Sequence, residues 1–403
     1  MRVLFVWEFG KGFGHVTMIM PVVEMLAARG AEIHLCFKSA RRLEASGAGD
    51  RFHVLPSPRH AASPRAAPDG DAPQGLSYSD TLIAVGYDQA EGLAGLIAGW
   101  REIYDRVAPD VVVAEYAPTA QLAARGHGFA TAAIGTGFTL PPLAMPMPAL
   151  RHWQPHDGAE LLRREEAVLA TINVALARLD LEPLAAVADM LRGDAEFLCT
   201  VPELDHYPGR ATRDYLGPIL KTDSGTEIEW RPGAGKRVFA YLKPDRGMFE
   251  PIMRALTELP PDCDTIAVFP DLPEPIRRQF EKPGLRILSQ HARLDRLLPG
   301  CDLAVHHAGA GITAAIALAG VPALMLPKHI EQTMTVKAAE RAGLGLGLSL
   351  LDDPAELRPR LHRLLSDPAY RASARAFARK YQNLDPAGVP ARIADAIEAL
   401  GGR

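Results

Sequence analysis

The 403-residue sequence has few cysteines, and their spacing argues against two kinds of site. Cys36, Cys199, Cys263 and Cys301 lie far apart, and no C-x-x-C pair occurs. Structural zinc sites and disulfide frameworks both need cysteines at short, patterned spacings. The sequence therefore predicts neither of them, and it suits a reducing cytosol.

A basic excess and a long apolar segment are also missing. The formal net charge is -4 and 23% of the residues are charged, which gives no support for a nucleic-acid-binding protein. The opening residues MRVLFVWE contain an apolar stretch too short for a signal sequence or a membrane span. We therefore expect a cytoplasmic protein with no integral membrane segment and no nucleic-acid partner.

The length of the chain predicts two domains, because one hydrophobic core rarely serves more than about 250–300 residues. The composition, with 48% hydrophobic residues, is that of an ordinary globular protein. A polar, glycine-rich run begins near Gly217 and ends before a new strand at Val238, which is typical of a linker. Two domains of similar size are expected to leave a cleft for ligands.

The first residues read as the opening of a doubly wound α/β sheet. A buried strand over Val3–Trp7 is followed by a glycine loop, a helix over His15–Ala28 and a strand over Ile33–Phe37. Ligands of such sheets bind beyond the carboxyl ends of the strands, where His15 begins its helix. The helix dipole disfavours the imidazolium, so His15 is expected to be neutral and able to accept a proton. Alternatively, His15 only caps the helix.

A second polar side chain is expected at the same edge of this sheet. After a helical region over Tyr78–Val107, the strand Val111–Ala114 ends at Glu115. Since carboxyl ends of parallel strands share one edge, Glu115 is placed near His15. It could instead cap the following helix together with Thr119. Two further helices are expected over Ala159–Leu179 and Leu184–Arg192.

The second half repeats the alternation of strand and helix. Its expected strands are Val238–Leu242, Thr265–Phe269, Leu285–Leu288, Asp302–His306 and Ala323–Leu326, and residues from Pro354 to Leu400 are expected to be helical. After Asp302–His306, a turn of small residues leads into a helix over Ile312–Leu318. Gly309 and Gly311 remove side chains there, so the free N–H groups of the new helix can receive a phosphate.

These residues carry a family resemblance. HHAGAGIT followed by GVPALMLPKHIEQ resembles the nucleotide-sugar signature of the UDP-glucuronosyl- and glucosyltransferase-like family of glycosyltransferases, which includes bacterial macrolide and antibiotic glycosyltransferases and has the GT-B fold. The resemblance implies two Rossmann-like, doubly wound domains facing a cleft. It assigns residues 1–217 to an acceptor-binding domain, 236–380 to a nucleotide-sugar-binding domain, and 381–403 to a helix that crosses back to the first domain.

The resemblance also assigns roles to individual residues. His15 would be the catalytic base, and Glu115 stands where the family has an Asp that holds the base. His307 would donate to a phosphate oxygen, while Glu331 and Gln332 would read the hydroxyls of the donor sugar. The residues expected to contact the donor are Gly14, Lys243, His307, Gly309, Gly311, Ile312, Thr313, Glu331 and Gln332.

Some of these residues could have another role, and two positions depart from the family pattern. Glu331 could be an ordinary acid at a helix N-terminus, and Lys243, where the family often has a small hydroxyl residue, could simply be solvated. Ala315 replaces the Glu that commonly binds ribose, and the region before Cys301 lacks the aromatic residue that stacks on the base in many relatives. The nucleotide base therefore stays open.

Acceptor binding is expected in two irregular segments of the first half. Pro56–Gln74 is dense in Pro, Ala and Gly and should be a mobile surface loop, while Phe138–Trp153 offers adaptable apolar surface. Phe138–Trp153 could also be a proline-stiffened connection. No metal is expected: the D-x-D matches Asp69–Asp71 and Asp262–Asp264 read as solvated turn acids.

The patterns together predict an inverting, metal-independent glycosyltransferase without a cofactor. It would move a sugar from a nucleoside diphosphate, UDP or dTDP, to a hydroxyl of a small, apolar acceptor. One alternative is a GT-B-like nucleotide-binding or scaffold protein without turnover. Another is an NAD(P)-dependent oxidoreductase, because Gly309, Gly311 and Ala314 satisfy G-x-G-x-x-A and Glu331 lies at the spacing of the ribose-binding acid.

Overall fold

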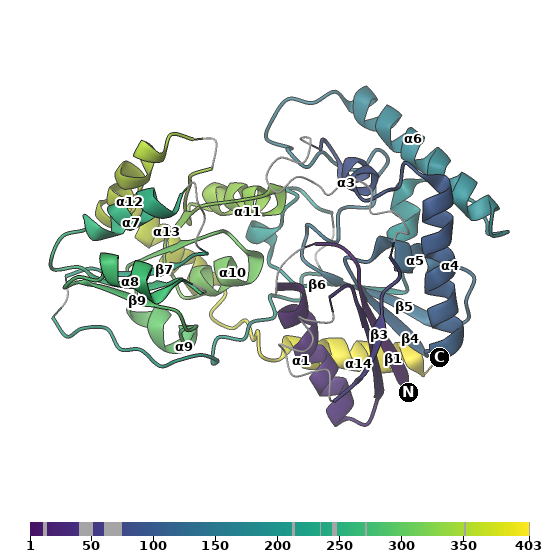
Figure 1. Ribbon diagram of the computed structural model, residues 1–403, viewed down its shortest axis with the longest axis horizontal. Helices are drawn as coiled ribbons and strands as arrows, with labels where there is room; N and C mark the ends of the chain where they lie inside the picture. The colour runs from purple at the N-terminus through teal and green to yellow at the C-terminus, as the bar shows by residue number, and fades with distance from the viewer. Residues whose placement is uncertain are drawn as a thin grey trace. The chain divides into compact units, whose positions relative to one another are not determined.

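The computed structural model describes residues 1–10, 14–39, 51–59, 75–211, 214–233, 235–243, 248–270, 272–349 and 352–402. The chain forms two compact units (Figure 1). Unit 1 comprises Met1–Thr200, Gly209–Ile219 and Ala387–Arg403, and unit 2 comprises Val201–Pro208 and Leu220–Pro386. The segment Val201–Pro208 thus packs in unit 2 although it lies inside the predicted range 1–217, and the final return to unit 1 begins at Ala387.

Unit 1 is built on a six-stranded sheet in the order β3-β2-β1-β4-β5-β6, with every paired strand parallel. Val3, Leu4, Phe5, Val6 and Trp7 of the central strand are completely buried, as expected for a parallel strand covered on both faces. The strands are β1 (Arg2–Trp7), β2 (Glu32–Phe37), β3 (His53–Pro56), β4 (Val111–Glu115), β5 (Ala130–Gly135) and β6 (Ala195–Leu198).

The helices of unit 1 include the last helix of the chain, α14, which packs against α1 (Figure 1). Two sequence predictions need correction. The predicted helix Tyr78–Val107 is interrupted around Gly86, whose φ of 102° no helix can contain, and Leu184–Arg192 forms only a 3-10 turn, Val187–Leu191. The helices are α1 (Gly14–Ala28), α3 (Tyr78–Ala84), α4 (Ala90–Val107), α5 (Pro118–Ala124), α6 (Gly158–Ala177) and α14 (Val389–Gly401).

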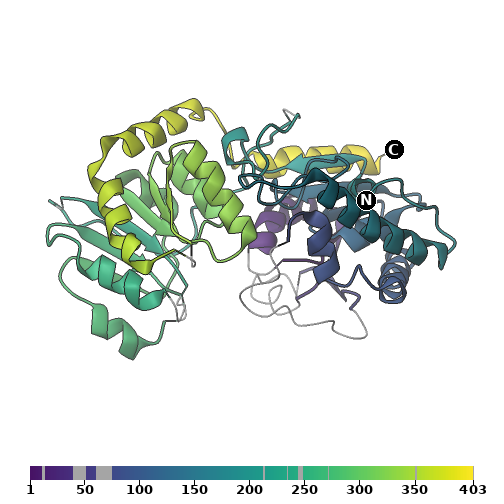
Figure 2. The same ribbon diagram turned by 90° about the horizontal axis from the view of Figure 1, so that it is seen from above.

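Unit 2 has a second parallel six-stranded sheet, in the order β12-β11-β10-β7-β8-β9. Alternate residues of its strands enter two separate hydrophobic clusters: Phe239 and Ala304 join one, Val238 and Leu303 the other. Both faces of the sheet are therefore buried under helices, as Figure 2 shows. The strands are β7 (Arg237–Tyr241), β8 (Asp264–Val268), β9 (Leu285–Leu288), β10 (Leu303–His306), β11 (Ala323–Met325) and β12 (Gly345–Gly347).

The predicted helical end of the chain is three helices rather than one region, since α13 and α14 are separated by residues 381–388. The helices of unit 2 are α7 (Phe249–Thr257), α8 (Glu274–Phe280), α9 (Leu294–Leu297), α10 (Ala310–Leu318), α11 (Ile330–Arg341), α12 (Leu357–Ser366) and α13 (Pro368–Lys380), with 3-10 turns at Pro202–Leu204, Leu298–Gly300 and Pro354–Glu356. Among the helices that the structure describes, none has the length and apolar character needed to span a membrane.

Both units have the same strand order, 3-2-1-4-5-6, counted within each unit. The prediction of two Rossmann-like, doubly wound α/β domains is confirmed. In such sheets the order reverses between the first and fourth strands, and ligands bind at that switch point. The switch points lie between β1 and β4 in unit 1 and between β7 and β10 in unit 2.

Candidate active site

His15 stands in the first turn of α1, directly beyond the end of β1. Its side chain packs over Gly10, and a Cβ atom added at Gly10 would overlap Nε2 and lie 2.7 Å from Cε1. Gly10 also has a φ of +80°, a conformation that side chains rarely adopt. Gly10 therefore leaves room for the imidazole, and His15 as a whole is only 8% exposed. The predicted donor contact Gly14 is the exposed first residue of the same helix.

Glu115 is the last residue of β4 and lies beside Trp7 of β1 in the sheet register. It is completely buried. His15 Nδ1 is 2.8 Å from Glu115 Oε1 and 2.9 Å from Oε2. Because a carboxylate only accepts hydrogen bonds, Nδ1 carries the proton and donates it to Glu115. Nε2 is then the basic nitrogen of the neutral ring. The structure thus brings together the two residues that the sequence placed at one sheet edge.

Two aromatic rings that the sequence analysis did not single out stack on His15. The Trp7 ring lies 5.1 Å from the imidazole at an interplanar angle of 24°, and the Tyr116 ring lies 6.2 Å away at 25°. Phe9 and Phe138 meet Tyr116 edge-on, at 5.6 and 5.8 Å. These contacts place the imidazole of His15 among apolar rings and restrict its orientation. The aromatic residues flanking both strand ends were the available signal.

Glu8 links the segment that follows β1 to the start of α5, which follows β4. Its carboxylate accepts from Trp100 Nε1 at 3.0 Å and from the first backbone amides of α5, Thr119 N at 2.8 Å and Ala120 N at 3.3 Å. Next to it, Phe9 N donates to Tyr116 O at 3.0 Å. Burial raises the pKa of Glu8, and these donors oppose that rise. Glu8, not Glu115, is thus the acid that caps α5.

At the switch point of unit 2, His307 follows β10 and Lys243 follows β7. His307 Nδ1 is 2.8 Å from Leu326 O, and Nε2 accepts from Lys243 N at 3.0 Å. Since Nε2 accepts, Nδ1 carries the proton and donates it to the carbonyl. In this arrangement the ring joins three strand ends rather than offering a proton to a phosphate, which differs from its expected role.

The turn before α10 has the expected open helix end, and α10 begins at Ala310, two residues earlier than predicted. Gly309 caps the helix with φ of -63° and ψ of 141°, and a Cβ there would touch only Ile312 Cγ2, at 3.7 Å. A Cβ at Gly311 would meet nothing within 4 Å. The amides of Ala310, Gly311 and Ile312 precede the first intrahelical bond, from Thr313 N to Gly309 O. Free amides at a helix N-terminus are suited to receive an anion.

Thr313 differs from its expected role in this site. Its hydroxyl donates to Gly309 O at 2.8 Å, and the residue is only 4% exposed. The proton that was expected to reach a phosphate is therefore used inside the helix. The backbone amides beside Thr313 are the better placed donors.

Glu331 and Gln332 lie in the first turn of α11, as the position after β11 implies. Gln332 Oε1 accepts from Lys328 N at 2.8 Å, so its carboxamide NH₂ is the group left to contact a ligand. Lys328 Nζ reaches Lys243 O at 3.5 Å. Sequence reasoning missed this second lysine, although it stands inside the quoted motif GVPALMLPKHIEQ. Glu331 follows a helix cap rather than a strand end, so the geometry does not favour the dinucleotide interpretation.

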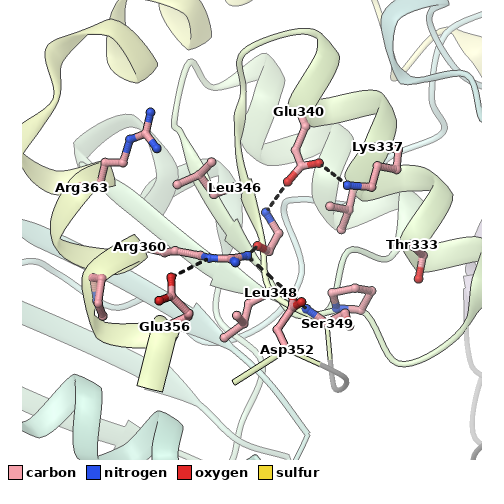
Figure 3. A pocket seen from close by; sticks show the side chains of 14 residues that line it. Thr333, Lys337, Glu340, Leu346, Leu348, Ser349, Asp352, Glu356, Arg360 and Arg363 are labelled. Atoms are coloured by element: carbon pink, nitrogen blue, oxygen red, sulfur yellow. Dashed lines mark hydrogen bonds and ion pairs between the residues drawn. The ribbon is translucent and has the colours of Figure 1, made fainter. Parts of the chain in front are cut away.

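Two features of unit 2 lie apart from these residues. A cavity of about 600 Å³ is lined by α11, β12 and α12, and most of its charged groups are paired, Lys337 with Glu340 and Arg360 with Asp352 and Glu356 (Figure 3). Asp264, predicted to be a solvated turn acid, is instead buried and accepts from Arg231 N and Arg286. Asp69–Asp71 lies outside the described residues, as do residues 60–74 of the predicted loop.

Known proteins with similar sequences include glycosyltransferases. Residues 264–400 match the family of the erythromycin biosynthesis protein CIII-like C-terminal domain. The elloramycin glycosyltransferase ElmGT of Streptomyces olivaceus is 35% identical over 112 residues, which is 28% of each chain. A PGL/p-HBAD biosynthesis glycosyltransferase of Mycobacterium tuberculosis is 27% identical over 330 residues, 75% of this chain and 74% of the relative.

The fold has solved counterparts. The crystal structure of the glycosyltransferase VinC in complex with dTDP superposes with a TM-score of 0.68 at 17% identity, covering 98% of this chain and all of VinC. The predicted family resemblance and the GT-B fold are confirmed. Residues 264–400 are thus similar to the EryCIII-like C-terminal domain, the chain as a whole has the GT-B fold, and the similar proteins named here are glycosyltransferases.

Proposed function

We propose that the protein transfers a sugar from a nucleoside diphosphate to a hydroxyl of a small, apolar acceptor, with inversion at the anomeric carbon and without a metal ion. The observation that carries the proposal is the hydrogen bond from His15 Nδ1 to Glu115 at 2.8 Å. It leaves Nε2 as a proton acceptor at the carboxyl end of the sheet. A buried, oriented imidazole is suited to general-base work.

In the proposed reaction, the acceptor oxygen attacks the anomeric carbon as the bond from that carbon to the diphosphate breaks. The acceptor proton passes to His15 Nε2, and the negative charge of Glu115 stabilises the imidazolium that forms. A single displacement of this kind inverts the anomeric configuration. Typically a positioned base contributes about a hundred- to ten-thousandfold to the rate.

The leaving diphosphate needs neutralisation, and unit 2 offers it from the protein itself. The first amides of α10 would receive phosphate oxygens, and Lys243 and Lys328 would add positive charge. This supports a mechanism without a metal and moves the predicted role of His307 to positioning the β7 and β11 strand ends. VinC was crystallised with dTDP, which favours dTDP over UDP in this chain, while Ala315 implies ribose contacts unlike those of the wider family.

The acceptor is proposed to meet the aromatic side chains of unit 1. Tyr116 lies next to His15, and Phe138, which meets Tyr116 edge-on, opens the segment predicted to hold the acceptor. Aromatic walls suit a largely apolar molecule that carries a hydroxyl. All four cysteines are free and buried, which fits our proposal that the reaction takes place in the cytoplasm.

A transfer assay with a donor panel tests the proposal. The purified protein is incubated with dTDP-, UDP- and GDP-sugars and a set of polyketide and phenolic acceptors, and products are read by mass and by the anomeric coupling in NMR spectra. We expect product from a dTDP- or UDP-sugar, with inverted configuration. A protein that is thermally stabilised by a nucleotide sugar but gives neither transfer nor hydrolysis would instead be a binding protein. Retained configuration would exclude the single displacement.

A further inference from the structure

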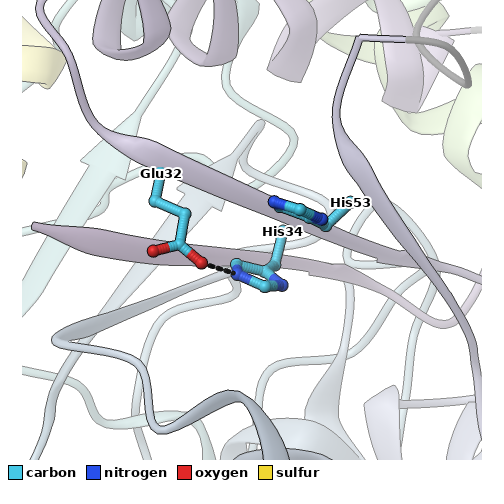
Figure 4. A group of neighbouring side chains, drawn as sticks. All are labelled: Glu32, His34 and His53. Atoms are coloured by element: carbon cyan, nitrogen blue, oxygen red, sulfur yellow. Dashed lines mark hydrogen bonds and ion pairs between the residues drawn. The ribbon is translucent and has the colours of Figure 1, made fainter.

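Three side chains with metal-binding chemistry meet on the edge of the unit 1 sheet. β2 and β3 are neighbouring parallel strands, and His34 lies directly opposite His53 in their register. Glu32 precedes His34 by two residues, so the two side chains point to the same face of β2. Glu32 and His53 are exposed, and His34 is partly buried (Figure 4). The sheet, rather than sequence spacing, brings the three together.

The donor atoms of these residues already lie close to one another. One ligand atom from each of Glu32, His34 and His53 lies within 4.8 Å of the others. His34 Nε2 and Glu32 Oε1 are 2.8 Å apart, and the two imidazoles stack with centroids 4.7 Å apart at 21°. Bonds of about 2.0–2.2 Å to a tetrahedral ion place ligand atoms roughly 3.3 Å apart. Small side-chain rotations of the two exposed residues would reach that spacing.

We propose that Glu32, His34 and His53 bind a divalent transition-metal ion, with Zn²⁺ the ion that the donors favour. Two imidazoles and one carboxylate are a known ligand set for zinc, whereas Mg²⁺ and Ca²⁺ prefer oxygen ligands alone. The fourth position would be taken by water, because two of the three residues face solvent. Cysteine spacing gives no signal for such a site, because the site contains no cysteine.

The competing explanation is a plain surface ion pair. Arg2 Nε lies 3.2 Å from Glu32 Oε1, and hydrogen bonds from His34 and Arg2 lower the pKa of Glu32. A bound ion would have to share or displace the Arg2 contact. Arg2 has other partners that can keep it in place, since Nη1 donates to Val107 O at 2.7 Å and to Ala108 O at 3.1 Å. Glu32 also has a second carboxylate oxygen for the ion.

The bound ion would stabilise the fold of unit 1 and would take no part in the transfer reaction. Glu32 and His53 are the first residues of β2 and β3, whereas His15 follows the carboxyl end of β1 and Glu115 is the last residue of β4. An ion held by both strands would cross-link the four-residue edge strand β3 to β2. Binding to the folded state alone raises the stability of the protein. The proposal is therefore independent of the proposed function.

Metal titration of tag-free, chelator-treated protein tests the site. Zn²⁺ binding is measured by calorimetry, and Co²⁺ is used as a spectroscopic probe whose visible absorption reports four-coordinate geometry. The variants are His53→Gln and Glu32→Gln, and the control is His362→Gln, an exposed histidine of α12. Circular dichroism without metal confirms that each variant is folded.

We expect the parent and His362→Gln to bind one equivalent and to gain melting temperature with Zn²⁺. His53→Gln and Glu32→Gln should weaken binding at least roughly tenfold, as loss of even a supporting group does. Absence of binding by the parent at micromolar Zn²⁺ would overturn the proposal. So would equal affinity in parent and variants, which would mean that the ion binds elsewhere.

Discussion

At the scale of single residues, His15 is defined by what surrounds its ring. Glu115 accepts the hydrogen bond from Nδ1, Trp7 and Tyr116 stack on the ring, and Gly10 leaves room for it. The expected Asp of the family is one methylene shorter than Glu115, yet both oxygens of Glu115 reach Nδ1. The longer acid therefore serves the position that the family gives to an Asp.

Glu115→Gln should lower transfer by about ten- to a thousandfold, less than removal of His15 itself. The amide can still accept from Nδ1 but carries no charge to stabilise the imidazolium. Steady-state turnover and donor affinity are measured together. If turnover stays at the parental level, Glu115 does not support the base, and if donor affinity falls equally, the variant has disturbed more than the pair.

Gly10→Ala should lose most activity, because the new Cβ would displace the His15 ring. Its φ of +80° adds backbone strain of about 1 kcal/mol. Gly126→Ala is the matched control: its φ is +79°, and nothing lies within 4 Å of the added Cβ. In denaturant titrations Gly126→Ala should lose only the stability that its backbone strain costs, whereas Gly10→Ala should lose more, because the displaced ring also gives up its hydrogen bond to Glu115. An active Gly10→Ala protein would contradict the placement of His15.

His306 predicts a pH dependence of stability. It is completely buried, and burial, aided by the neighbouring His307, lowers its pKa to about 3. The unfolded imidazole titrates near 6.5, so the unfolded state binds more protons below that pH. The stabilisation is complete above about pH 6.5 and is lost as the pH falls towards 3, by up to about 1.4 kcal/mol per pH unit.

The test compares the parent with His306→Asn, whose side-chain oxygen can still accept from Ala308 N, the bond that Nδ1 makes at 3.0 Å. Between pH 6.5 and 5 the parent should lose about 1.6 kcal/mol more unfolding free energy than the variant. His362→Asn, at an exposed position, should keep the parental slope. Equal slopes in parent and His306→Asn would show that His306 is charged in the folded protein.

At the scale of elements, the start of α10 is the feature expected to hold the diphosphate. Gly309→Val should abolish donor binding while the protein stays folded. Valine favours the extended conformation that Gly309 has, and its Cβ would meet only Ile312 at 3.7 Å, but its methyl groups would cover the amides. Calorimetry with the nucleoside diphosphate measures the loss, with Gly128→Val as control. Parental affinity in Gly309→Val would move the phosphate site elsewhere.

The ends of the strands could be predicted from the sequence, but the contacts between the strands could not. Strand ends were predictable because apolar runs stop at polar residues, and parallel strands share an edge, so His15 with Glu115 and Lys243 with His307 were expected near one another. Contacts that depend on register were not predictable. Trp7 lies beside Glu115, and His34 beside His53, only through strand pairing. The tautomer of His307 depends on Leu326, nineteen residues further along the chain.

Short or polar elements also escaped prediction. β3 has four residues, with His53 and Val54 exposed, and therefore lacks the apolar pattern of a buried strand. The break between α3 and α4 depends on one glycine, Gly86, in a long amphipathic region. The start of α10 lay two residues too late in the prediction because small residues such as Ala310 and Gly311 give no periodic signal.

At the scale of the whole molecule, each unit has its own switch point and its own candidate residues. Unit 1 carries the hydrogen-bonded pair of His15, the proposed base, and Glu115, and unit 2 carries the open end of α10 with Lys243 and Lys328. The two tasks should therefore separate by mutation. Changes in unit 1 should alter turnover, whereas changes at α10 should alter donor binding.

The most direct test of the proposed reaction is the transfer rate of His15→Ala beside that of the parent, with donor affinity measured on the same samples. We predict that turnover falls about a hundred- to ten-thousandfold, because the acceptor loses its positioned base, while the donor binds as before. Near-parental transfer by His15→Ala would contradict the central claim that His15 takes the proton of the acceptor.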